Sequence, residues 1–208
     1  MKLEYSDVKK TAGKLKFRTK AFIDGKFVNA ASGKTYVSVN PATGQPLTNI
    51  ASCDRADVDL AVKAARRSFE QGVWSKRSPA ERKQVLLKLA DLLEENLAEI
   101  ALLDCLDAGK PITDCMTIDA PDTVHCFRWH AEAIDKEYEK VAPTGPGNVA
   151  MVVREPLGVV GAALCKHMDV DAAAFTGSTD VGRQLLHYSA ESNLKRIVLE
   201  LGGKNPQL

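Results

Sequence analysis

The 208-residue sequence has no long apolar run and almost no net charge. A membrane-spanning helix needs roughly 20 consecutive apolar residues, so no membrane span is predicted, and no hydrophobic region marks a signal peptide. The formal net charge of +1 argues against a nucleic-acid-binding surface, because such surfaces need a clustered basic excess. Lysines do cluster before residue 20, but Glu4 and Asp7 interrupt them, so we interpret this stretch as a solvated tail.

The sequence also lacks paired cysteines. Its five cysteines are an odd number with no CxxC spacing, so we expect no disulfide framework, reduced thiols and a cytoplasmic protein. His125, Cys126 and His130 could place two metal ligands one helical turn apart. No second ligand pair accompanies them, so we interpret them as half-buried helix residues and expect no metal.

The N-terminal half is typical of short strands followed by amphipathic helices. Apolar pairs surround Asp24-Gly25, which predicts a hairpin over residues 21–28 because a type I′ turn needs positive φ. Further strands are expected at residues 35–40 and 47–52. Four helices follow, capped at Asp54 and at Ser78 in the first two, and their apolar stripes predict a core rather than a cofactor site. We expect the helices to begin near residues 54, 78, 97 and 120, with the last ending near 139.

In the C-terminal half the pattern changes to short apolar strands, which are typical of a parallel sheet. A crossover helix over residues 181–190 separates two of them and predicts one β-α-β unit. Only residues 164–170 join the preceding two strands, whereas a parallel crossover needs about ten to twelve residues. Either these two strands are not parallel neighbours, or a crossover is missing. The strands are expected at residues 149–154, 157–163, 171–175 and 196–199.

The segment Phe175-Thr-Gly-Ser-Thr179 follows a strand and precedes a helix. Backbone N–H groups at such a position can bind an anion, and the helix dipole favours negative charge. Gly177 would permit a ligand to come close to the backbone, and Ser178 offers a hydroxyl to a phosphate oxygen. Simple helix capping by Ser178, Thr179 or Asp180 explains the same residues equally well. The GxGxxG fingerprint of dinucleotide-binding proteins is absent.

Glu200 follows an apolar strand directly and precedes Gly202-Gly203. Ligands of open α/β sheets bind at the carboxyl ends of the strands. Glu200 would serve as a general base there if burial raised its pKa. Alternatively, it is a structural residue that accepts hydrogen bonds from turn amides.

These motifs resemble those of the aldehyde dehydrogenase superfamily. Residues 199–206 fit the family's glutamate signature, and residues 175–179 match its nicotinamide-cofactor loop. The resemblance extends over about residues 20–208, and within the family it is greatest to bacterial enzymes that oxidise γ-glutamyl-aminobutyraldehyde and related polyamine-derived aldehydes. Supporting matches lie at residues 22–26, 40–44, 107–111 and 154–159.

The resemblance implies an α/β fold with a partial Rossmann-like parallel sheet, an N-terminal helical layer and a β-hairpin. It implies NAD(P)-dependent oxidation of an aldehyde to a carboxylic acid, with Glu200 as the general base. Residues 140–162 resemble the hairpin with which subunits of the family pair, so a homo- or hetero-oligomer is expected. The residues implied to contact NAD or NADP are Phe175, Thr176, Gly177, Ser178, Val181, Leu201 and Gly202.

The sequence also departs from the family. A proline-tryptophan-asparagine-phenylalanine-proline segment, whose asparagine holds the oxyanion, and a lysine-containing segment that contacts the adenine ribose have no match after Ala162. The nucleophilic cysteine has no match either, because Cys165 fits no nucleophile motif. We therefore expect an internally deleted and C-terminally truncated family member that is inactive alone. The alternatives are a regulatory fragment that associates with intact subunits, and an inert product.

The expected organisation has four parts. They are a flexible tail (1–20), a hairpin and helices of the cofactor domain (21–139), an oligomerisation-type hairpin with the first sheet strand (140–162), and a remnant of the dinucleotide-binding domain (163–208).

Overall fold

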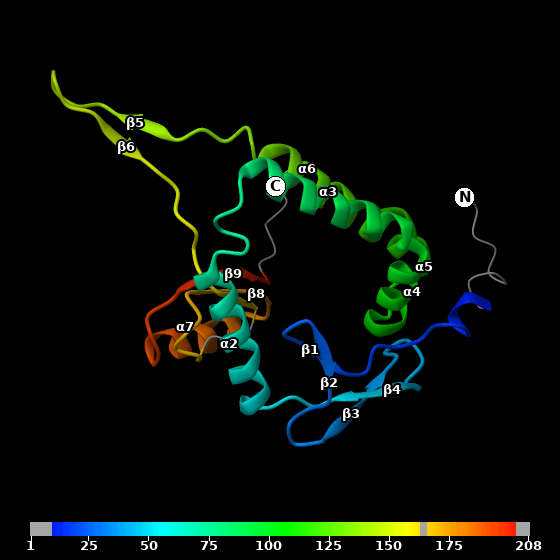
Figure 1. The fold of residues 1–208 in the computed structure, drawn as a ribbon. Helices are drawn as coiled ribbons and strands as arrows, with labels where there is room; N and C mark the ends of the chain where they lie inside the picture. Colours follow the sequence, from blue (N-terminus) through cyan, green and yellow to red (C-terminus); the bar gives the residue numbers. More distant parts are fainter. Residues whose placement is uncertain (1–9, 163–165, 203–208) are drawn as a thin grey trace, which may run out of the picture. The chain divides into compact units, whose positions relative to one another are not determined.

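The computed structural model describes residues 10–162 and 166–202 (Figure 1). The chain forms two compact units, each assembled from separate segments. The first unit combines the residues up to Ala21 with Ser32–Ser52 and Arg77–Tyr138, and the second combines Phe22–Ala31, Cys53–Lys76 and the residues from Glu139 onward. None of the helices in the described ranges is long and apolar enough to cross a membrane. Residues 1–9 of the expected tail lie outside the description, and residues 10–12 form a helical turn.

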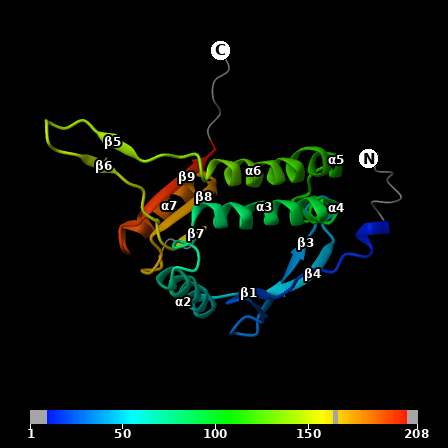
Figure 2. The same ribbon diagram turned by 45° about the horizontal axis from the view of Figure 1, so that its top comes forward.

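The first unit contains a β-hairpin and a group of helices. Strands β3 (Thr35–Val39) and β4 (Pro46–Ala51) pair antiparallel, with a shift in register after Ser38. Ser78 and Glu81 form the expected capping box at the start of the second predicted helix. Figures 1 and 2 show α3 and α6 side by side. The helices are α3 (Pro79–Glu95), α4 (Leu97–Ala108), α5 (Ile112–Asp114), the π-helix η1 (Cys115–Asp119) and α6 (Ala120–Ala133).

Two details of these helices differ from the expectation. Helix α6 ends at Ala133 rather than near residue 139, and it continues directly from the π-helical turn η1. Cys115 in that turn is fully buried and packs with Ala101 and Ala120. One extra residue in a helical turn changes which side chains face inward, and no local pattern in the sequence indicates this change.

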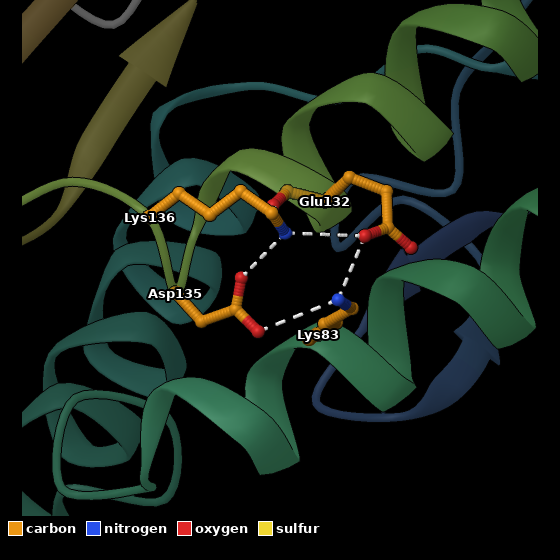
Figure 3. Close-up of polar contacts among 4 residues, drawn as sticks. All are labelled: Lys83, Glu132, Asp135 and Lys136. Atoms are coloured by element: carbon orange, nitrogen blue, oxygen red, sulfur yellow. Dashed lines mark hydrogen bonds and ion pairs between the residues drawn. The ribbon is translucent and has the colours of Figure 1, made fainter.

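Four charged residues form a closed ring between α3 and α6 (Figure 3). Lys83 Nζ lies 2.7 Å from Glu132 Oε2 and 3.3 Å from Asp135 Oδ2. Lys136 Nζ contacts the same two residues at 3.3 Å and 3.0 Å. The hydrogen bond with Glu132 raises the pKa of Lys83, and the lysines lower the pKa of both carboxyl groups. The ring therefore links the two helices electrostatically.

The second unit begins with the hairpin of β1 (Ala21–Ile23) and β2 (Lys26–Val28). Asp24 and Gly25 have φ angles of 52° and 74°, which confirms the predicted turn. Helix α2 (Arg55–Gln71) follows, capped by Asp54 as expected. Asp57 is buried in its first turn, and its carboxylate accepts the N–H groups of Ala31 (2.8 Å) and Asp54 (3.0 Å). These two bonds fix the segment before β3 to the start of α2.

Strands β5 (Lys140–Ala142) and β6 (Ala150–Val152) form an antiparallel hairpin that extends into solvent (Figure 1). Val141 pairs with Met151, and the two side chains are 70% and 62% exposed. Exposed apolar residues that pair across the strands of a hairpin are typical of an interaction surface.

The dinucleotide-type sheet has three parallel strands in the order β7–β8–β9. They are β7 (Val160–Ala162), β8 (Ala172–Gly177) and β9 (Arg196–Leu201), with α7 (Thr179–Ala190) between the last two. Leu185 of α7 packs on Ala173, and Ile197 and Leu199 join the same cluster. On the opposite face, Val160 and Val198 are 56% and 51% exposed. The expected partial α/β sheet is thus confirmed, with a helix on one face.

The short link before β8 joins two parallel neighbours, because Val160 pairs with Ala172 in parallel register. The alternative that these strands are not neighbours is therefore wrong. In the described part of the link, Val170 is fully buried against Val62 and Val159. This contact anchors the link on α2.

Asp171 and Asn193 supply hydrogen bonds at the C-terminal end of this link. Asp171 Oδ2 accepts the N–H of Val159 and a guanidinium N–H of Arg66, both at 2.7 Å. Asn193 Nδ2 donates to the carbonyl oxygens of Met168 (2.7 Å) and Val170 (3.0 Å). The side chains of Asp171 and Asn193 thus bind backbone groups of Val159, Met168 and Val170.

Candidate functional site

The candidate site lies at the carboxyl ends of β8 and β9, where α7 begins. The parallel register places Phe175 beside Leu199, Thr176 beside Glu200, and Gly177 beside Leu201. The N–H of Gly202 donates to the carbonyl oxygen of Gly177 at 3.2 Å. All the residues expected to contact the cofactor therefore lie on one β-α-β unit, as the sequence indicates. Gly203, which completes the Gly-Gly pair, lies outside the described residues.

Ser178 is the N-cap of α7. Its Oγ accepts the N–H of Val181 at 3.3 Å, and its carbonyl oxygen accepts the N–H of Gly182 at 3.0 Å. The capping interpretation is thus correct, and it leaves the hydroxyl hydrogen able to donate to a ligand. The N–H groups of Thr179 and Asp180 have no acceptor in the described part of the chain. The exposed Asp180 carboxylate opposes an anion there, although Arg183 lies 3.6 Å from it.

Two glycines allow close packing around this helix start. A Cβ on Gly177 would lie 2.5 Å from Cζ of Phe175, so the ring covers the backbone at this position. A Cβ on Gly182 would lie 2.6 Å from Cδ2 of Leu201, so α7 packs directly on β9. Gly182 thereby determines how near the helix start lies to the end of β9.

Glu200 is exposed, on the sheet face opposite the cluster formed by Phe175 and Leu199. The general-base interpretation requires burial, and that condition is not met here. In the alternative role, the Glu200 carboxylate would accept hydrogen bonds from turn amides, but no such hydrogen bond is found among the described residues. The position at the strand end remains suited to contact with a ligand.

Three of the described cysteines have a raised thiol pKa. Burial raises the pKa of Cys115 to about 11, and a hydrogen bond with Asp104 adds to the effect. Burial also raises the pKa of Cys53 and Cys105. A nucleophilic cysteine needs the opposite shift, because the thiolate is the reactive form. Cys165 lies outside the described residues.

Cys126 and His130 make a contact that resembles a catalytic pair, with Sγ 3.6 Å from Nδ1. The same Nδ1 lies 2.8 Å from the carbonyl oxygen of Cys126. A carbonyl oxygen only accepts hydrogen bonds, so Nδ1 carries the proton and cannot take one from the thiol. The pair is a local contact within α6. His125, Cys126 and His130 are helix residues as predicted, but they are exposed rather than half-buried, because they lie on the face of α6 that the other helices leave uncovered.

A different group, Asp104, Cys115 and Asp119, brings three ligand-type atoms within 4.8 Å of one another. The raised pKa of Cys115 keeps the thiol protonated at neutral pH, and Lys110 forms an ion pair with Asp119. These residues are better suited to hydrogen bonding than to metal ligation.

Sequence reasoning missed the contact between Arg66 and Asp171. Arg66 also donates to the carbonyl oxygen of Asp169 at 2.6 Å, so one guanidinium holds the link that precedes the candidate site. Arg66 and Asp171 lie 105 residues apart, and no local pattern connects them. Gly158 is a local sign of this contact. Its φ is 108°, and a side chain at this position would overlap the Asp171 carboxylate.

Comparison with known proteins identifies the relatives of this chain. The model of the aldehyde dehydrogenase family matches residues 27–162 and 159–208. Aminoacetaldehyde dehydrogenase of Pseudomonas aeruginosa is 43% identical over 261 aligned residues, which include 94% of this chain and 53% of the relative. The chain spans about half the length of the curated relatives that it matches.

Solved structures show the same likeness. γ-Glutamyl-γ-aminobutyraldehyde dehydrogenase of Burkholderia cenocepacia superposes with a TM-score of 0.93 and 38% identity, covering 97% of this chain and 54% of that one. A variant of P. syringae indole-3-acetaldehyde dehydrogenase in complex with NAD⁺ and IAA superposes with a TM-score of 0.94 and 36% identity. The superposition covers 99% of this chain and 55% of that one.

These alignments also locate a discontinuity. The 261-residue alignment is longer than the whole 208-residue chain, so the relative has residues without a counterpart here. The two segments matched by the family model meet at residues 159–162, around β7 and just before the short link. This agrees with the second alternative, that a crossover is missing between β7 and β8.

Proposed function

The chain belongs to the aldehyde dehydrogenase family, and from this premise we propose that its β8–α7–β9 unit forms part of an NAD(P)-binding surface. The observation that supports the proposal is the start of α7. There, a serine hydroxyl and two backbone N–H groups face the carboxyl ends of two parallel strands. An anionic group such as a pyrophosphate fits this position.

Each residue has a defined role in the proposal. Ser178 donates its hydroxyl hydrogen to a phosphate oxygen while its lone pair continues to accept Val181 N–H. Gly177 lets the Phe175 ring lie directly against the backbone before α7, and the ring would form one wall of the cofactor site. The cofactor, when bound, supplies the hydride acceptor for oxidation of an aldehyde to a carboxylic acid. The full proposed set of cofactor contacts is Phe175, Thr176, Gly177, Ser178, Val181, Leu201 and Gly202. Glu200 is proposed as the general base by its match to the family's glutamate signature, although its exposed position in this chain does not supply the burial that raises a carboxyl pKa.

Binding of the cofactor can be tested with a substitution that preserves the helix cap. Aspartate is as good an N-cap as serine, so Ser178→Asp should keep α7 folded while its charge repels a phosphate. We expect NAD⁺ affinity, measured by titration calorimetry, to fall at least roughly tenfold. Ser78→Asp, the same change at the N-cap of α3, is the matched control and should leave affinity unchanged. Equal affinities for Ser178→Asp and the unmodified chain would refute the proposal.

We further propose that this polypeptide, alone, does not oxidise aldehydes. The supporting observation is chemical: three described thiols have raised pKa values, and the hydrogen bond of His130 prevents it from activating Cys126. The purified chain is incubated with NAD⁺ and aminoacetaldehyde, indole-3-acetaldehyde or γ-glutamyl-γ-aminobutyraldehyde, and NADH is followed by absorbance. NADH production that disappears after alkylation of the thiols would overturn this proposal.

A second candidate function is association with other subunits, and the β5–β6 hairpin favours it. Val141 and Met151 form an exposed apolar cross-strand pair, as an interaction surface requires. Met151→Asp should abolish concentration-dependent association in sedimentation velocity and co-purification with an intact relative. Glu155→Asp, which changes no charge just beyond the hairpin, is the control. Unchanged association of Met151→Asp would contradict this role.

The proposal also assigns roles to two segments of the chain and a cellular compartment to the protein. Residues 140–162 would provide subunit contact, and residues 163–208 would provide the dinucleotide-binding remnant. The four described cysteines are free, which supports a reducing, cytoplasmic environment.

A further inference from the structure

A cavity of about 430 Å³ lies in the second unit, between the β1–β2 hairpin and α2. Its volume is within the range of small-molecule binding sites. Apolar side chains line it from both elements: Ile23 and Val28 from the hairpin, and Leu60 and Ala64 from the helix. Leu60 is exposed although it faces the hairpin. The cavity therefore offers apolar surface that the fold itself does not bury.

The acidic residues of this cavity already have partners. Asp24 Oδ1 lies 2.6 Å from Arg67 Nη2. Asp57 uses both carboxylate oxygens to accept backbone N–H groups. Neither carboxylate is left to neutralise another cation in the cavity.

Two lysines of the cavity have no such partner. Lys26 comes from β2 and Lys63 from α2, and neither makes an ion pair or a side-chain hydrogen bond with the described residues. Two ammonium groups beside an apolar cavity produce a local positive potential, which selects an anion. Because the walls are apolar, the anion must also have an apolar body.

We propose that this cavity binds a free amphiphilic carboxylate, with its apolar chain against Leu60 and its carboxylate facing Lys26 and Lys63. The site is separate from the β8–α7–β9 unit in sequence and uses none of its residues. Its existence therefore does not depend on cofactor binding or on dehydrogenase activity.

Octanoate is a suitable probe, titrated into the full chain and followed by ¹H–¹⁵N NMR. We expect shifts in residues 23–31 and 57–67, and no comparable shifts for octanol or octylammonium. Lys63→Gln should weaken octanoate binding by about tenfold, the effect of one charge-assisted contact. Adding Lys26→Gln should remove measurable binding. Lys88→Gln, an exposed lysine on α3, is the matched control and should have no effect.

Leu60→Asp tests the apolar wall independently and should abolish binding while leaving the far-ultraviolet circular dichroism unchanged. Octanol binding as tightly as octanoate would overturn the proposal, because the lysines would then contribute nothing. Equal effects of Lys63→Gln and Lys88→Gln, or shifts confined to other residues, would overturn it as well.

Discussion

Asp171 is the residue whose replacement tests most directly how the short link before β8 is held. Its Oδ2 accepts the N–H of Val159 and pairs with Arg66, each at 2.7 Å. Asp171→Ala leaves the buried Val159 amide without an acceptor, which costs about 1.5–3 kcal/mol for a bond to a charged group. The side chains of Arg66 and Asp171 are 25% and 34% exposed, so solvent limits their ion pair to about 0.5 kcal/mol.

Together these losses predict that Asp171→Ala lowers the free energy of unfolding of the second unit by about 2–3.5 kcal/mol. Urea denaturation gives the total, and hydrogen exchange at the Val159 amide gives the local effect. Asp171→Asn separates the two contributions, because an amide oxygen still accepts the Val159 N–H while the charge is lost. It should cost less than about 1 kcal/mol.

Asp169→Ala is the matched control, since Arg66 contacts only the backbone carbonyl of residue 169. That variant should unfold like the unmodified chain. If Asp171→Ala proves as stable as Asp169→Ala, or the Val159 amide exchanges at the same rate in both, the proposed role of the carboxylate is wrong.

Three further predictions concern other parts of the chain. Gly158→Ala should destabilise by more than about 1–2 kcal/mol, the cost of positive φ alone, because its methyl group displaces the Asp171 carboxylate; urea denaturation measures this. The lysines lower the pKa of Glu132. Ionised Glu132 therefore stabilises the folded chain fully at pH values above the ordinary carboxyl pKa, and this stabilisation is lost as the pH falls through the lowered pKa of the folded state. Glu132→Gln should therefore flatten the loss of stability between about pH 7 and pH 3. Cys115 is fully buried and its pKa is raised to about 11, so iodoacetamide labelling at about pH 8, followed by mass spectrometry, should leave it unmodified.

Each of these predictions has an internal reference. Gly147 has a φ of 82° with nothing near its added Cβ, so Gly147→Ala should show the backbone cost without the clash. Equal losses for Gly147→Ala and Gly158→Ala would exclude the clash. Glu95→Gln, at the end of α3 and outside the ring, should leave the acid dependence of unfolding unchanged if the ring causes that dependence. The exposed Cys126 should be labelled readily, and equal labelling of Cys115 would contradict its burial.

Local hydrogen bonds explain which parts of the fold could be predicted. Asp54 and Ser78 cap their helices through side chains two or three residues away, and the Asp24-Gly25 turn needs only its own φ angles. The same holds for the start of α7, where Ser178 bonds to Val181. In each case the residues that form the turn or the helix cap lie within a few positions of one another in the sequence.

The features that escaped prediction depend on distant residues. The exposure of Glu200 depends on which elements cover that face of the sheet, and the Arg66–Asp171 contact joins α2 to the link before β8. The π-helical turn before α6 is stabilised by burial of Cys115 against Ala101. Periodicity identified the surrounding helices but could not show these tertiary contacts.

The bare face of the parallel sheet has a consequence for the lifetime of the chain in a cell. Val160 on β7 and Val198 on β9 are both exposed on this face, and exposed apolar strand surface is the kind that chaperones hold and proteases select. Turnover of the chain should then depend on how soon that face is covered after synthesis. A substitution such as Val198→Thr would lengthen its half-life without altering α7, which packs on the other side of the sheet.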